Sequence, residues 1–162
     1  MTSSDMQLTI ERTYSAPLDK VWGLWTTKDG FESWWGPQGF RVQVSDLDAR
    51  EGGVLRYEMK AATPEMVAAM ERMGQPSSHL VQARYAGFEP RKHLVIASVI
   101  DFIPDVPNYE NQITVDFFVE ATHVRMVVNL QPMHDAEMSR MQQEGFTSQL
   151  TKVDARFATS DG

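Results

Sequence analysis

The stretch that decides the fold reads "TYSAPLDKVWGLWTTKDGFESWWGP" and covers residues 13–37. Its first residues complete an alternation of apolar and polar side chains that predicts a β-strand over 7–16. Pro17 then suits the first turn of a helix, and the apolar residues after it recur at helical spacing. A second short helix is expected from residue 28 to the Gly-Pro pair that stops it. The chain therefore opens with a strand and two short helices.

The adjacent tryptophans Trp34 and Trp35 lie at the end of the second short helix. Neighbouring residues on a regular helix or strand cannot both face one core. In one interpretation, one tryptophan packs into the core and the other faces the rim of a groove. In the other, both fill the end of the sheet, because tryptophan is a large packing residue. The sequence leaves both interpretations open.

Period-two alternation predicts six further strands in the rest of the chain. A Gly-Gly pair at 52–53 suits the turn between the first two of them, because glycine readily takes positive φ. A helix near 64–73 interrupts the strands, with Thr63 as its N-cap and three methionines on one face. A long helix over 134–157 ends the pattern. The six strands are expected at 40–48, 54–59, 80–90, 93–102, 112–120 and 124–132.

This order of elements predicts the architecture. Consecutive strands joined by short links favour an antiparallel sheet, and the C-terminal helix is the predicted element long enough to cover one face of it. We therefore predict an α+β fold in which a curved antiparallel sheet wraps around that helix. Two short helices follow the first strand, and an inserted helix lies near 64–73. Residues 1–162 contain no linker or repeat, so we expect a single domain.

A set of motifs extends over nearly the whole chain: Ala16-Pro17, Val21-Trp22, Trp34-Trp35-Gly36-Pro37, Asp48 with Gly52-Gly53, and the long helix over 135–157. In these motifs the chain resembles the activator-of-heat-shock-protein-90-ATPase homologue family, part of the SRPBCC or START-like superfamily. The resemblance implies the helix-grip fold that this superfamily shares with the birch-pollen allergen. Superfamily members bind sterols, lipids, hormones and polyketides, and some catalyse cyclisation, so the resemblance implies no single function. The methionine-rich insert at 61–79 departs from the short family pattern.

Composition limits the partners. The net charge is −7 and no Lys/Arg-rich block is present, which argues against nucleic acid and anionic membranes. No apolar run reaches the roughly 18 residues of a membrane span, and the first residues do not resemble a signal peptide. The absence of cysteine excludes disulfides and thiolate chemistry and suits a reducing cytoplasm, where we expect the protein to reside.

The residues that could carry chemistry form no recognisable catalytic set. The histidines, His79, His93, His123 and His134, lack metal-ligand spacing, so we expect no metal site and no cofactor. A carboxylate buried in a cavity could act as a general acid or base. The candidates for that role are Asp101, Asp105, Asp116 and Glu58. Strand parity turns Asp116 away from the apolar face, so Asp101 is the better candidate.

Apolar strand faces and ten methionines favour a cavity between the sheet and the C-terminal helix. Our leading hypothesis is that a small apolar or aromatic molecule binds there, with the helix near 64–73 as a lid, although methionine also fills ordinary cores. A cofactor-independent enzyme of the cyclase, dehydratase or hydrolase type and a chaperone-related interaction module are the alternatives, and a homodimer is possible. Arg84, Tyr85 and Arg125 could anchor polar groups of the ligand. The expected ligand-binding residues are Trp35, Tyr57, Met59, Met70, Phe102, Phe117, Met126, Met138, Met141 and Phe146.

Overall fold

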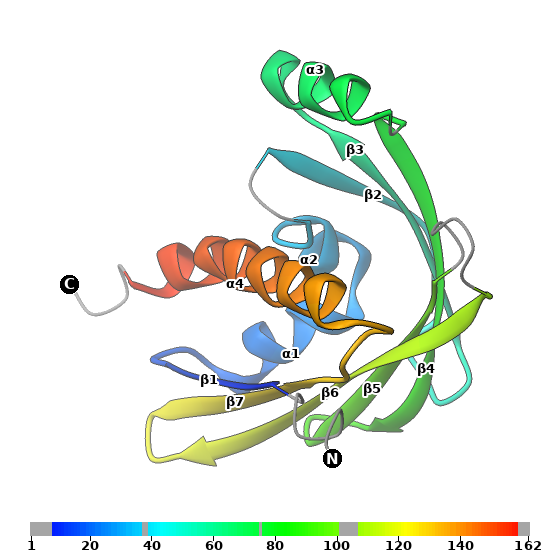
Figure 1. Cartoon of the computed structure of the whole chain (residues 1–162). Helices are drawn as coiled ribbons and strands as arrows, with labels where there is room; N and C mark the ends of the chain where they lie inside the picture. The colour runs from blue at the N-terminus through cyan, green and yellow to red at the C-terminus, as the bar shows by residue number, and fades with distance from the viewer. Residues whose placement is uncertain (1–7, 37–38, 75, 101–106, 159–162) are drawn as a thin grey trace.

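The computed structural model describes residues 8–36, 39–74, 76–100 and 107–158. Figure 1 shows one curved sheet with a long helix on its concave side. The elements in chain order are β1 (Leu8–Tyr14), α1 (Leu18–Thr26), α2 (Lys28–Glu32), β2 (Phe40–Leu47), β3 (Val54–Ala61), α3 (Pro64–Arg72), β4 (Ser78–Glu89), β5 (His93–Ile100), β6 (Tyr109–Glu120), β7 (His123–Leu130) and α4 (Ala136–Ala158).

The seven strands form one antiparallel sheet in the order β1-β7-β6-β5-β4-β3-β2. Five of the six pairings join strands that follow each other in the chain. The exception is β1, which pairs with β7 in a register that sets Leu8 against Leu130 and Tyr14 against Val124. The predicted α+β helix-grip fold is confirmed: a curved antiparallel sheet wraps around α4, and α1 and α2 follow the first strand.

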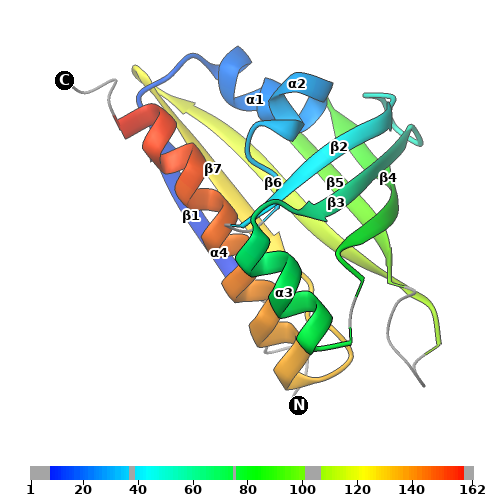
Figure 2. The same cartoon turned by 90° about the horizontal axis from the view of Figure 1, so that it is seen from above.

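The inserted helix α3 has the ends that the sequence predicts. The Thr63 side chain accepts a hydrogen bond from the Met66 backbone N–H, Pro64 occupies the first turn, and Gly74 follows the helix with φ +72°. All nine residues of α3 are described, and none of them is fully buried. Figure 2 places α3 at one end of the sheet and the α1–α2 pair at the other. The helix therefore lies at the margin of the core.

Polar contacts hold the helix α4 along both of its flanks. On one flank Asp154 accepts a hydrogen bond from the Tyr14 hydroxyl at 2.8 Å and pairs with Arg12 of β1 at 3.3 Å. On the other flank the Gln149 side-chain oxygen accepts from the Gly36 N–H at 3.0 Å, and the Lys152 ammonium donates to the Gly36 carbonyl at 2.8 Å. The helix thus joins β1 to the segment that follows α2.

Two predictions about the helices were wrong. Met141 was expected on the apolar stripe of α4, but its side chain is 52% exposed. It lies five positions before the buried Phe146, which is about 140° around the helix. The second correction concerns α2, which ends at Glu32, so Trp34 and Trp35 lie beyond the helix and not within it.

Candidate functional site

Both adjacent tryptophans are buried in the core. Trp34 is 1% and Trp35 is 5% exposed. Both lie in the turn that follows α2, where the Trp35 N–H still donates to the Phe31 carbonyl at 3.0 Å, and both side chains enter the core. Their rings meet edge to face with centroids 5.0 Å apart. The interpretation that both fill the end of the sheet is therefore the correct one.

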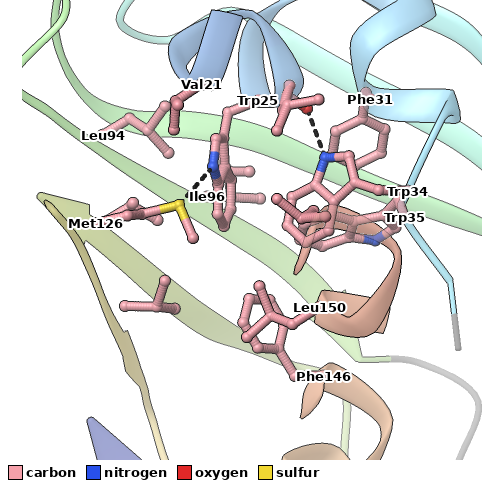
Figure 3. Close-up of a cluster of buried hydrophobic side chains, with 14 of the residues drawn as sticks. Val21, Trp25, Phe31, Trp34, Trp35, Leu94, Ile96, Met126, Phe146 and Leu150 are labelled. Carbon is pink, nitrogen blue, oxygen red and sulfur yellow. Dashed lines mark hydrogen bonds between the residues drawn. The ribbon is translucent and has the colours of Figure 1, made fainter. Parts of the chain in front are cut away.

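Trp34 also completes the end of α1. The last carbonyls of a helix have no partner within the helix and need donors from elsewhere. The Trp34 indole N–H donates to the Leu24 carbonyl at 2.8 Å, and the Tyr85 hydroxyl donates to the Trp25 carbonyl at 2.7 Å. Figure 3 shows the first of these bonds as the dashed line from the Trp34 nitrogen. Aromatic side chains thus act as C-terminal caps inside the core.

Around these tryptophans lies the aromatic cluster, which consists of Trp25, Phe31, Trp34, Trp35, Tyr57 and Phe146. Phe31 stacks on Trp35 with ring centroids 4.5 Å apart, and the Trp35 indole donates to the Tyr57 hydroxyl at 3.0 Å. Phe146 of α4 approaches Trp35 to 6.0 Å. These rings occupy the space between α2, the sheet and the middle of α4, where the sequence suggested a cavity (Figure 3).

The structure divides the ten expected ligand-binding residues into groups. Those packed in the core are Trp35, Tyr57, Phe117, Met126 and Phe146. Met59, Met70 and Met138 are half-buried and could touch a ligand without unpacking the core, whereas Met141 faces solvent. Phe102 lies outside the described residues.

Beyond the aromatic cluster, the concave face of the sheet continues but is less covered. Strand register keeps Met59, Val81, Ser98, Ile100 and Ile113 on the same face as the buried core residues, yet all five are only half-buried. We call this set the half-buried concave surface. Its Met59, Val81 and Ile113 pack against the core. Among the described residues, this set is the part of the concave face that stays partly uncovered.

One flank of α4 borders this surface with residues four and three positions apart: Met138, Gln142, Gly145 and Gln149. The Gln142 amide donates to Asn111 of β6 at 2.7 Å. Gln149 is 4% exposed, and its amide nitrogen has no hydrogen-bond partner among the described residues. Sequence analysis missed both glutamines. The signal that could have identified them is their spacing, because two glutamines seven positions apart lie on the same flank of a helix.

The described carboxylates considered as catalytic groups lie on the outer face of the sheet. Asp116 faces outward, as strand parity predicts, and hydrogen-bonds His93 at 2.8 Å. Glu58 pairs with Lys60 at 3.6 Å. Asp101 and Asp105 lie outside the described residues. Where the structure describes the chain, no three His, Cys, Asp or Glu side chains gather as metal ligands.

Two of the expected polar anchors also face outward, because Arg84 pairs with Glu110 at 2.9 Å and Arg125 with Glu120 at 3.0 Å. The third, Tyr85, is fully buried and engaged at the end of α1. None of the three therefore presents its polar group to the half-buried concave surface.

Burial raises the pKa of Tyr57 from its ordinary value of 10.0 to about 12, and the hydrogen bond from Trp35 lowers it by less. A neutral tyrosine with a raised folded pKa contributes stability that is complete below pH 10 and is lost as the pH rises to about 12. For Tyr57 this loss amounts to about 2–3 kcal/mol. In Tyr57→Phe we expect the free energy of unfolding to fall less as the pH rises, because the contribution of Tyr57 is absent. Urea unfolding between pH 9 and about 12 measures this difference from the wild type.

The substitution also removes the acceptor of the Trp35 N–H, but that effect is the same at every pH. Only a difference in slope between the two stability curves tests the prediction. Parallel curves for the wild type and Tyr57→Phe would show that Tyr57 ionises equally easily in both states.

Surface pockets lie away from the aromatic cluster. One of about 540 Å³ lies between α1 and the end of α4, with Gly23, Leu24 and Phe157 in its wall. Another of about 790 Å³ lies at the β4–β5 turn and includes Phe117 of the expected residues. None of the helices in the described ranges has the length and apolarity needed to cross a membrane.

Comparisons with known proteins agree with this architecture. The family model of the Activator of Hsp90 ATPase homolog 1-like proteins matches residues 15–158. An AHSA1 protein from Silicibacter pomeroyi has 21% identity and a TM-score of 0.73, over 95% of this chain and 99% of that one.

A protein from Arthrobacter aurescens has 18% identity and a TM-score of 0.75, over 98% and 90% of the two chains. One from Chromobacterium violaceum has 18% identity and a TM-score of 0.73, over 93% and 96%. These structural likenesses concern the fold. No curated protein matches the sequence.

Proposed function

Because the chain belongs to the family of Activator of Hsp90 ATPase homolog 1-like proteins, we propose that it uses its helix-grip fold to bind a small apolar or aromatic molecule. The site is the half-buried concave surface, between the sheet and the α4 flank that carries Met138, Gln142 and Gln149. The observation that carries the proposal is that apolar side chains continue along the concave face beyond the filled core. There they are left partly uncovered.

The chemistry of this surface suits an apolar ligand. Met59, Val81, Ile100 and Ile113 offer aliphatic and thioether groups, and burying their remaining exposed area against a ligand is favourable. Met138 on α4 and Met70 on α3 are half-buried and flexible, so they can adapt to an irregular shape. Because α3 buries no residue fully, it can move without opening the core.

The two alternatives receive less support from the described residues. An enzyme that uses a cavity acid needs a carboxylate at the concave face, and Asp116 and Glu58 lie on the outer face. An interaction module was expected to expose an apolar patch at Trp34 or Trp35, and both are buried. Small-molecule binding is therefore the function that the geometry supports best.

The first experiment is native mass spectrometry of the purified protein, repeated after denaturing extraction. An additional small-molecule mass that disappears on extraction is the expected result. In parallel, the neutral dye N-phenyl-1-naphthylamine should gain fluorescence on binding and lose it when the natural ligand is added. A clean protein mass together with no dye binding would reject the proposal.

Charged substitutions at the concave surface and on α3 should separate binding from folding. We expect Met59→Glu and Met70→Glu to weaken dye binding about tenfold or more, because a carboxylate beside an apolar ligand must be desolvated. Met70→Glu should change stability by less than about 1 kcal/mol, because α3 contributes little to the core. Fluorescence titration and thermal melts measure the two effects.

Met141→Glu is the matched control, because Met141 lies on the same helix as Met138 but faces solvent. It should leave dye affinity unchanged. If Met70→Glu unfolds the protein instead, α3 belongs to the core and does not act as a lid.

A further inference from the structure

The side-chain amide of Gln149 has one end bound and one end unpaired. Its oxygen accepts the Gly36 N–H at 3.0 Å, while its nitrogen is buried and has no acceptor among the described residues. Exchanging the two ends would not help, because the amide nitrogen would then face another N–H. The orientation is therefore fixed, and within the described part of the chain the two hydrogens of the nitrogen have no partner.

Such an arrangement is uncommon in folded proteins. More than nine in ten buried polar groups have a hydrogen-bond partner, since an unpaired one forfeits its bond to water. A leucine or methionine at position 149 would remove the unpaired amide donor but would leave the Gly36 N–H without its acceptor, whereas a glutamate would accept from Gly36 and carry no amide donor. The presence of an amide donor at this position therefore indicates the chemistry of the group that the donor meets when the site is occupied.

The position of Gln149 connects it to the proposed binding surface. It lies on the α4 flank that also carries Met138 and Gln142, opposite the flank on which Asp154 binds β1. The Gln142 amide nitrogen donates to Asn111, whereas the buried Gln149 nitrogen has no partner among the described residues. Its anchor residue, Gly36, directly follows Trp35 of the aromatic cluster. The donor thus lies where the filled core gives way to the half-buried concave surface.

We propose that the ligand presents a carbonyl or carboxylate oxygen to the Gln149 amide nitrogen, with its apolar body on the half-buried concave surface. This inference rests on the proposed function and adds the polar end of the ligand to it. A pure hydrocarbon would leave the donor unpaired, whereas an acceptor oxygen satisfies it without moving Gly36. Because the nitrogen is covered, the ligand must displace neighbouring side chains to reach it.

Matched probes test this inference. The pair 2-acetylnaphthalene and 2-ethylnaphthalene share their carbon skeleton and differ in one carbonyl oxygen, and 2-naphthoate tests a carboxylate. Displacement of N-phenyl-1-naphthylamine from the wild type should show the acetyl compound or the naphthoate binding about tenfold more tightly than the ethyl compound. Preference for the acetyl compound assigns a neutral carbonyl ligand, and preference for the naphthoate assigns a carboxylate.

Variants of Gln149 assign that preference to the amide. Gln149→Met should abolish it while keeping the affinity for 2-ethylnaphthalene. Gln149→Glu keeps an oxygen for the Gly36 N–H and should do the same, so it serves if the methionine variant does not fold. Gln143→Met, on the exposed face of α4, should keep the preference.

The outcomes separate the two proposals. Equal binding of all three compounds to the wild type would overturn the role of Gln149 and leave apolar binding standing, as would a preference that survives in both Gln149 variants. If none of the compounds binds and native mass spectra are clean, both proposals fail.

Discussion

Replacing Trp34 with alanine is expected to lower the free energy of unfolding by about 4 kcal/mol. The indole is 1% exposed and packs edge to face against Trp25 and Trp35, so its removal leaves a large cavity between rings that cannot collapse. It also removes the donor that satisfies the Leu24 carbonyl at the end of α1. Against a total stability of roughly 5–15 kcal/mol for a domain, this single change would leave little margin.

Two companion variants divide this effect into parts. Trp34→Phe keeps an aromatic ring but loses the hydrogen bond and some volume, and should cost about 1–3 kcal/mol. Trp22→Ala removes a tryptophan that is only half-buried and should cost less than Trp34→Ala. Urea unfolding followed by circular dichroism measures all three. A Trp34→Ala cost near 1 kcal/mol, about that of one hydrogen bond, would contradict the role of the cluster as packed core.

Gly30→Ala should be the second most damaging substitution, with a cost of about 3 kcal/mol. A Cβ atom at Gly30 would overlap the carbonyl oxygen of Gly23 in α1 and would lie 2.7 Å from the Thr27 hydroxyl oxygen. Since the first of these is a backbone atom, relief requires α1 and α2 to move apart. That movement would also shift Trp34 and Trp35, which follow α2.

Gly23→Ala provides the matched control on the facing helix. A Cβ atom there meets nothing within 4 Å, so the substitution only improves helix propensity and should stabilise the protein by about 0.5–1 kcal/mol. Thermal melts test the pair, because the melting temperature should fall in Gly30→Ala and rise in Gly23→Ala. Equal effects at positions 23 and 30 would mean that α1 and α2 do not approach as closely as the structure shows.

The fold could be predicted from the sequence because local signals are strong here. Alternation marks the strands, and Thr63, Pro64 and Gly74 bound α3 as expected. The pairing of β1 with β7 could not be read from such signals, since nothing local specifies a partner so far along the chain. The exposure of Met141 was also missed. Its apolar character placed it on the predicted apolar stripe of the helix, although its position lies beside that stripe.

The candidate site was less predictable than the fold. Strand parity identified which residues face inward, including Tyr57, Met59 and Phe117, but parity cannot tell a filled interior from an open one. That distinction depends on how Trp35 and Phe146 meet across the sheet, which is a property of tertiary packing. Gln149 was missed for a related reason, since its unpaired nitrogen becomes visible only when every neighbour is in place.

The pairing of β1 with β7 also affects how the chain acquires its structure during synthesis. Thr9 and its partner Asn129 are 120 residues apart. At about 5–20 residues per second, the ribosome needs roughly 6–24 s to make the partner after β1 has been made. Strands β2 to β6 can pair with their sequence neighbours during this interval, whereas β1 has to wait. The sheet is therefore completed late, when the newly made β7 meets the first strand to have been translated.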